Sequence, residues 1–342
     1  MKPVTIKDIA KKIDISYSTV SRALNNDEKI NIDTRRLVKE TAEAMSYFPN
    51  LTARGLVKGG AESIAFISTR FAAPFISSIL DTFEQEAFYS KRYVHGIIPY
   101  STRNEGDVRD NLLKSILKGR KADAVVMLTI KPPRKILDEY NRVGIPVLLI
   151  ENRMKGAYSI TLDNNAGAKA AAEHLIKRGS KNICLIVGET VQPPSREKHI
   201  AAVERKTAFL NVLQKHGVKL KENCINTIHA YTHEEGKESV DRFLKNGIKP
   251  DAVFCAAGDI VAMGVMERLK ELKYRIPEDV AVIGYDDILA ARHLNPPLTT
   301  VRQPLEEIGA MAFKMIIDAI DGKNIKRKSV LIKPDFVIRK SA

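Results

Sequence analysis

Two patterns of hydrophobic and polar residues divide the chain. Over the first sixty residues, apolar side chains recur three and four positions apart, which places them on one face of short helices. From residue 61 onward, short apolar runs alternate with longer amphipathic stretches. The pattern therefore predicts an all-α N-terminal head, residues 1–48, and an α/β core, residues 61–342.

The head contains three helix starts of one design. Each has a residue that can cap a helix and a pair of apolar residues that can pack across the first turn. The expected caps are Thr5, Ser16 and Asp33, and the expected pairs are Val4 with Ile9, Ile15 with Val20, and Ile32 with Leu37. Only Asp14 and Ile15 lie before the second cap, which leaves room for a tight turn and predicts a helix-turn-helix.

The second helix, expected from Tyr17 to Asn25, has the character of a DNA reader. Val20 and Leu24 are four residues apart and share one face, and most of the other side chains are polar and include Arg22. A short helix with this division is what recognition in the DNA major groove requires. The helix starts alone also fit a small bundle that docks on proteins, and that alternative stays open at this point.

Residues 49–60 form a separate segment. Pro49 ends the preceding helix and Asn50 can cap a new one, but the new helix would be barely two turns and contains Gly55. Helices this short are marginal in water, and an interior glycine costs a further ~1 kcal/mol. We expect a hinge that becomes helical only against a partner; a plain interdomain linker is the alternative.

The core pattern predicts parallel sheets. Strands are expected at residues 63–67, 93–98, 124–128, 147–150, 159–162, 183–188, 224–228, 252–255 and 280–284, with helices between them. Such alternation is typical of two doubly wound parallel-sheet subdomains with helices on both faces. The N-subdomain is expected at about 61–160 and 292–322, and the C-subdomain at about 161–291 and 323–342. Ligands of such sheets bind beyond the carboxyl ends of the strands, so the natural site lies between the two sheets.

Composition and charge narrow the function. The 342 residues carry a formal net charge of +14, which suits a polyanionic partner such as nucleic acid. The first sixty residues hold 11 Lys and Arg against 7 Asp and Glu, a net of +4, which leaves +10 for the rest. The head is therefore about twice as densely charged as the core. Charge supports DNA binding without proving it.

The sequence lacks the features of disulfide-rich, zinc-binding, secreted and membrane proteins and of the common enzyme families. The three cysteines, Cys184, Cys224 and Cys255, are too few and too far apart for a disulfide framework or a zinc site. The N-terminus has no apolar signal-peptide region, and no apolar run approaches a membrane span. Phosphate loops, nucleotide-binding glycine fingerprints, paired-histidine metal motifs and nucleophile elbows are missing. We expect a cytoplasmic protein that is not an enzyme and needs no cofactor, metal or membrane.

The motifs TIKDIAKKIDISYSTVSRALN and YFPNLTARGL, at this separation, resemble the head and hinge of the lactose-repressor (LacI/GalR) family of bacterial transcription regulators. The resemblance implies that Tyr17, Ser18 and Arg22 read base edges. It implies that phosphates are contacted or positioned by Thr5, Ser16, Thr19, Ser21, Asn25 and Asn50. Leu56, with Ala53 beside it among the hinge contacts, matches a residue that wedges between base pairs from the minor groove.

The resemblance extends over the core, including LDNNAGAKAAAEHLIKRG, GDIVAMG and IPEDVAVIGYDD, which look like periplasmic sugar-binding proteins. It implies an effector site that contains Phe75, Glu151, Asp163, Arg205, Tyr231 and Asp286. Ordinary structural roles are the alternatives: core packing for Phe75, a helix cap for Asp163, a surface position for Arg205 and loop organisation for Asp286.

The implied function is a dimeric, ligand-responsive repressor of a carbohydrate-utilisation operon that binds a near-palindromic double-stranded DNA operator. Its effector is expected to be a sugar or sugar phosphate, which controls hinge order and thereby operator affinity. A purine-like corepressor or a protein co-effector is the alternative, and a solute-binding protein is a remote one. The chain ends soon after Arg339 without a leucine heptad tail of the tetramer-forming kind, which favours a homodimer.

Overall fold

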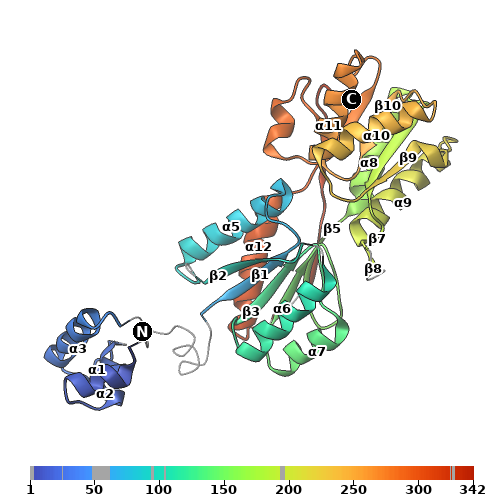
Figure 1. The fold of residues 1–342 in the computed structure, drawn as a ribbon. Coiled ribbons are helices and arrows are strands. Elements are labelled where there is room, and N and C mark those ends of the chain that lie inside the picture. Colours follow the sequence, from blue (N-terminus) through green and yellow to red (C-terminus); the bar gives the residue numbers. More distant parts are fainter. Residues whose placement is uncertain are drawn as a thin grey trace. The chain divides into compact units, whose positions relative to one another are not determined.

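The computed structural model describes residues 4–24, 26–47, 62–93, 96–103, 105–192, 197–323, 325 and 328–342. The chain forms two compact units, Met1–Ala61 and Glu62–Ala342 (Figure 1). Four of the expected DNA contacts lie outside the described residues: Asn25, Asn50, Ala53 and Leu56. The hinge segment that was expected at 49–60 also lies outside them.

The head consists of α1 (Ile6–Lys12), α2 (Tyr17–Leu24) and α3 (Ile32–Ala44). Its centre is formed by one apolar face of each helix, with the buried residues Ile9, Ala10, Val20, Ala23, Val38 and Ala42. The first two caps are confirmed: the Asp8 carboxylate accepts hydrogen bonds from the Thr5 backbone and hydroxyl, and Ser16 Oγ accepts one from the Thr19 amide at 3.1 Å.

The cap of the third helix was predicted two residues too late, at Asp33. Asn31 is the cap of α3, and its side chain accepts a hydrogen bond from the Asp33 amide at 2.9 Å. The expected apolar pair is also wrong, because Ile32 is 71% exposed and Leu37 is 48% exposed. The true cap lies two residues before Asp33, so Ile32 is the first residue of the helix and not the residue before its cap.

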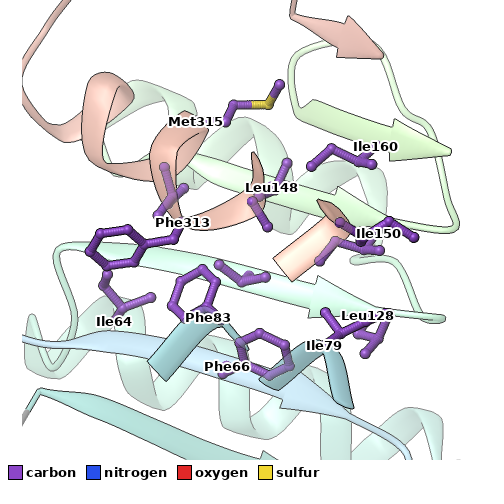
Figure 2. Close-up of a cluster of buried hydrophobic side chains, with 14 of the residues drawn as sticks. Ile64, Phe66, Ile79, Phe83, Leu128, Leu148, Ile150, Ile160, Phe313 and Met315 are labelled. Atoms are coloured by element: carbon purple, nitrogen blue, oxygen red, sulfur yellow. The ribbon is translucent and has the colours of Figure 1, made fainter. Parts of the chain in front are cut away.

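The N-subdomain is built on a parallel six-stranded sheet of order β13-β5-β4-β3-β1-β2. Its strands are β1 (Ile64–Ser68), β2 (Ile97–Ser101), β3 (Ala124–Leu128), β4 (Val147–Ile150), β5 (Tyr158–Leu162) and β13 (Ser329–Ile332). Helices α5 (Pro74–Ser90) and α12 (Leu305–Ile320) cover one face, and α6 (Gly106–Gly119) and α7 (Arg134–Arg142) cover the other (Figure 1). Phe83 of α5 packs edge-on against Phe66 of β1 and Phe313 of α12, with ring centroids 5.4 and 5.3 Å away (Figure 2).

The C-subdomain repeats this architecture with the strand order β14-β12-β11-β10-β6-β9. Its strands are β6 (Ile183–Gly188), β9 (Ile225–Ile228), β10 (Ala252–Cys255), β11 (Ala281–Asp286), β12 (Thr299–Arg302) and the antiparallel β14 (Asp335–Val337). Helices α8 (Asn164–Arg178) and α9 (Ile200–Lys215) cover one face, and α10 (His233–Lys245) and α11 (Asp259–Glu271) cover the other. Smaller elements are the β7 (Val191–Gln192) and β8 (Glu197–Lys198) pair, and the 3₁₀ turns η1 (Glu222–Cys224) and η2 (Leu289–His293).

The crossings between the subdomains differ from the expected boundaries near 292 and 323. Strand β12 pairs with β11, so residues 299–302 belong to the C-subdomain, and β13 pairs with β5, so residues 329–332 belong to the N-subdomain. The chain thus passes between the sheets after β5, β12 and β13. The strand expected at 93–98 is also shifted, because Tyr93 has a left-handed backbone (φ 57°) and β2 begins at Ile97.

Candidate functional site

The polar face of α2 presents the side chains expected to read DNA. Tyr17 is 65% exposed and Ser18 and Arg22 are exposed, whereas Val20 and Ala23 have no exposed surface. The turn before this helix contains Asp14 in a left-handed conformation (φ 52°), which Asp tolerates better than most residues. The packing of α2 against α1 and α3 therefore turns its polar face outward.

The hydroxyl groups at the start of α2 are joined to one another. Ser16 Oγ lies 2.7 Å from Ser18 Oγ and 2.8 Å from Thr19 Oγ1. Thr5 at the start of α1 is bonded to Asp8, and Ser21 is half-buried. The hydrogen bonds hold the hydroxyls of Thr5, Ser16, Ser18 and Thr19 in defined positions, as groups that position DNA phosphates need to be.

Arg205 is the centre of the predicted effector site. It projects from α9 and is only 9% exposed. Its Nε donates to Asn164 Oδ1 at 2.8 Å, and its terminal nitrogen donates to the Ala256 carbonyl at 2.9 Å. The guanidinium also lies over the ring of Tyr285. The structure excludes a helix-surface role for this residue.

Glu151 reaches this centre from the other subdomain. It follows β4 with a left-handed backbone (φ 61°) and is 8% exposed. One carboxylate oxygen accepts from the Leu162 amide at 2.9 Å, and the other accepts from Asn164 Nδ2 at 3.5 Å. Burial raises the pKa of Glu151, while the charge of Arg205 opposes that shift. Asn164, which was not predicted, is therefore the link between Glu151 and Arg205.

Asp286 adds a second carboxylate at the end of β11. Its backbone has a positive φ of 114°, and its carboxylate accepts a hydrogen bond from the side-chain amide of Gln303. Burial raises the pKa of Asp286 to about 7, although the Arg205 charge lowers it. A carboxyl with this pKa can accept or donate a hydrogen bond near neutral pH.

Tyr231 and His199 form an aromatic pair beside Arg205. Tyr231 is 37% exposed, and its ring lies so close to Gly188 that a Cβ there would be 2.0 Å from the Tyr231 hydroxyl. The His199 ring lies 6.3 Å from the Tyr231 ring. Burial, with a smaller effect from Arg205, lowers the pKa of His199 to about 4, so the imidazole is neutral. Its Nδ1 is buried without a hydrogen-bond partner in the described part of the chain.

His199 was missed because it lies in a stretch, Glu189–His199, whose sequence matches no recognisable pattern, and nothing in the composition marks it. The other two predicted effector residues each have a structural role as well, and their contact with an effector stays a prediction. Phe75, in the first turn of α5, packs against the N-subdomain core. Asp163 caps α8 and accepts a hydrogen bond from the Ala166 amide at 3.0 Å.

Further polar contacts join the two subdomains. Arg153, just after β4, forms an ion pair with Glu204 of α9 at 2.9 Å. Arg70, after β1, donates to the Ala230 carbonyl at 2.7 Å. No His, Cys, Asp and Glu cluster suitable for a metal ion occurs among the described residues, and no helix there is long and apolar enough to cross a membrane.

Both units of the chain match models of known protein families. The profile of "Bacterial regulatory proteins, lacI family" matches residues 5–50, and that of the "Periplasmic binding protein-like domain" matches residues 172–342. The HTH-type transcriptional repressor PurR of Photorhabdus laumondii is 31% identical over 343 residues, which cover 98% of this chain and 96% of the relative. The chain belongs to the lacI family. Seven other repressors named PurR are 28–31% identical to this chain.

Solved structures of the family share the fold. The lac repressor dimer bound to operator and an anti-inducer is 22% identical, with a TM-score of 0.78 and 99% coverage of both chains. The transcriptional regulator CelR in complex with cellobiose is 24% identical, with a TM-score of 0.71 and coverage of 99% and 100%. The solved structures thus share the helix-turn-helix head and the periplasmic-binding-protein-like core of this chain, and the family model and the PurR relatives identify it as a DNA-binding transcription regulator of the lacI family.

Proposed function

We propose that this repressor responds to a purine-type base that binds between the subdomains at Arg205, Glu151 and Asp286. The observation that carries the proposal is the buried network in which Asn164 joins Glu151 of one subdomain to Arg205 of the other. A ligand that bonds to both subdomains at this point has a different affinity for different subdomain arrangements. Only such a difference allows a ligand to change the affinity for DNA.

The chemistry of the site suits a planar base. The edge of an oxopurine base carries ring N–H donors next to carbonyl acceptors. Glu151 and Asp286 supply acceptors, Arg205 supplies donors, and the neutral His199 Nδ1 is a further polar group in need of a partner. The partly exposed ring of Tyr231 offers an aromatic face for stacking. The relatives named PurR support this effector class over the sugar or sugar phosphate expected at first.

A sugar is the second candidate, because the CelR structure with the same fold holds cellobiose. The test uses the full chain and an operator selected from a random double-stranded DNA library. Fluorescence anisotropy then measures operator affinity with purine bases, nucleosides, mono- and disaccharides and sugar phosphates. We expect only a purine-type base to change the operator Kd, by at least about tenfold. A response to a sugar alone would overturn the proposed effector, and no response to any small molecule would point to a protein co-effector.

We further propose that a homodimer of this cytoplasmic repressor reads a near-palindromic operator, with Tyr17, Ser18 and Arg22 at the base edges. Arg22→Ala should weaken specific binding by about 10- to 100-fold, since a good base contact contributes about 1–3 kcal/mol. Arg36→Ala is the matched control, because Arg36 is an exposed arginine of the same head in an ion pair with Glu40. Equal losses in both variants would argue against base reading by Arg22.

A further inference from the structure

Two of the three cysteines lie next to each other in the C-subdomain. Cys184 is buried in β6, and Cys224 is half-buried at the end of η1, immediately before β9. Strands β6 and β9 are parallel, with Leu185 opposite Ile225. One residue before this first pair lie Cys184 in β6 and Cys224, the last residue of η1, so the two cysteines are neighbours at the amino ends of these strands.

Both side chains pack into the same apolar cluster of the C-subdomain, Cys184 as a buried member and Cys224 at its margin. Burial raises the pKa of Cys184, and the neighbouring Cys224 raises it further. Opposed residues of neighbouring strands are about 4.8 Å apart, which falls within the Cα separation that a disulfide spans.

Cys255 has a different position on the same sheet. It lies opposite Ile186, two residues further along the strands than Cys184. From the strand spacing and the rise per residue, its Cα is about 8 Å from that of Cys184, too far for a disulfide without backbone movement. The register thus selects one of the three possible cysteine pairs.

We propose that Cys184 and Cys224 are a redox-sensitive pair that closes to an intramolecular disulfide when the protein meets a peroxide. The half-buried Cys224 sulfur attacks hydrogen peroxide, the O–O bond breaks, and Cys224 becomes a sulfenic acid as one water leaves. The Cys184 sulfur then attacks the Cys224 sulfur, the S–O bond breaks, and a second water leaves with the Cys184 proton. Two thiols lose two electrons and two protons, and one peroxide is reduced to two waters.

The disulfide would act on the edge of the second sheet. Strand β9 is the outermost strand and pairs only with β6 among the described strands. The bond would fasten these strands at their amino ends, away from the polar cluster at the carboxyl ends. It would also close residues 184–224 into a covalent loop, which contains α9 and Arg205. A crosslink of this kind restricts the unfolded chain, so the oxidised core should unfold at a temperature several degrees higher.

The test uses the full chain, first reduced and then treated with hydrogen peroxide. Thiols are counted after alkylation in denaturant, and peptides are mapped by mass spectrometry without reduction. Wild type and Cys255→Ser should each lose two thiols and yield a peptide pair that joins Cys184 to Cys224, and dithiothreitol should reverse this. Cys184→Ser and Cys224→Ser should yield no intramolecular disulfide.

The wild-type peptide map decides the matter even if a variant folds poorly. A disulfide that includes Cys255, a bond between two chains, or a Cys224 sulfenic acid that dimedone traps without closure would each overturn the proposal. So would a protein that keeps all three thiols after treatment.

Discussion

The guanidinium carbon of Arg205 lies 3.6 Å from the centroid of the Tyr285 ring, and both side chains bond to the same atom, Asn164 Oδ1. Stacking and hydrogen bonding together fix the plane of the guanidinium. Arginine suits this position because its planar group can stack and donate at the same time, whereas the lysine ammonium is a compact point charge. The buried charge is thus placed before any ligand arrives.

Arg205→Lys should therefore weaken effector binding by about 10- to 100-fold while it leaves operator binding without effector nearly unchanged, because hydrogen bonds to charged groups contribute about 1.5–3 kcal/mol. Isothermal titration with the effector and anisotropy with the operator measure the two quantities. Arg242→Lys is the control, since Arg242 also donates to an asparagine, Asn226 at 2.6 Å, in the same subdomain. A similar loss of effector binding in both variants would show a general effect on the fold.

Asp286 and His199 should contribute to the pH dependence of core stability with opposite signs. The pKa of Asp286 rises from 3.8 to about 7 and that of His199 falls from 6.5 to about 4. Between about pH 4 and 7 the folded chain keeps a proton on Asp286 that the unfolded chain has lost, so this group lowers stability as pH rises. Between about pH 4 and 6.5 the unfolded chain protonates His199 and the folded chain does not, so this group raises stability as pH rises.

These slopes, each at most about 1.4 kcal/mol per pH unit, oppose one another in the wild type over their common range. Relative to the wild type, the slope of the free energy of unfolding against pH should become more positive in Asp286→Asn between about pH 4 and 7. In His199→Gln the slope should become more negative between about pH 4 and 6.5. Urea unfolding at a series of pH values measures both profiles; two variants with the same profile as the wild type would refute the opposed pair.

The contact between α10 and α11 depends on a glycine. A Cβ at Gly264 would lie 1.9 Å from the backbone oxygen of His233. Gly264→Ala should therefore destabilise the core by about 1–3 kcal/mol, although alanine by itself favours a helix by about 1 kcal/mol. Urea unfolding gives the value. The control Gly106→Ala, whose Cβ would have its nearest neighbour 3.9 Å away, should change stability by no more than about 0.5 kcal/mol, so equal effects would contradict this account.

The predictability of the strands follows their burial. Strands β3, β4, β6 and β10 were predicted at their observed bounds, because helices cover both faces of each sheet and the strands are continuous apolar runs. Strand β12 was missed although its first three residues are buried. Its threonines satisfy their hydroxyls internally: Thr300 donates to Asp259 at 2.6 Å and Thr299 accepts from the Arg339 amide. A buried strand with polar residues does not have a continuous apolar pattern. It cannot be predicted locally, because the partners that satisfy those residues are far away in the sequence.

The same reason limits what the sequence reveals of the site. Arg205, Glu151 and Asp286 were found through the family resemblance, and the structure gathers them around one network. Asn164 lies just after a predicted strand end but was not singled out as an effector residue, because an asparagine at a helix start is usually an ordinary surface residue. Its partners are up to 121 positions away in the chain. His199 was missed because its burial results from tertiary packing, which no local spacing predicts.

Asn164 offers the sharpest test of the network. Asn164→Ala removes the acceptor of Arg205 Nε and the donor to Glu151, which leaves two buried charged groups short of a partner. The core should lose about 2–3 kcal/mol of stability in urea unfolding, since an unsatisfied buried polar group costs about 1–3 kcal/mol and more when charged. Effector affinity in titration should fall as well, because the guanidinium is no longer held in its plane.

Asn165→Ala is the matched control: its side chain is exposed one position along α8, and its loss should change stability by no more than about 0.5 kcal/mol. If both alanines have the same small effect, the hydrogen bonds of Asn164 do not hold Arg205 and Glu151 together.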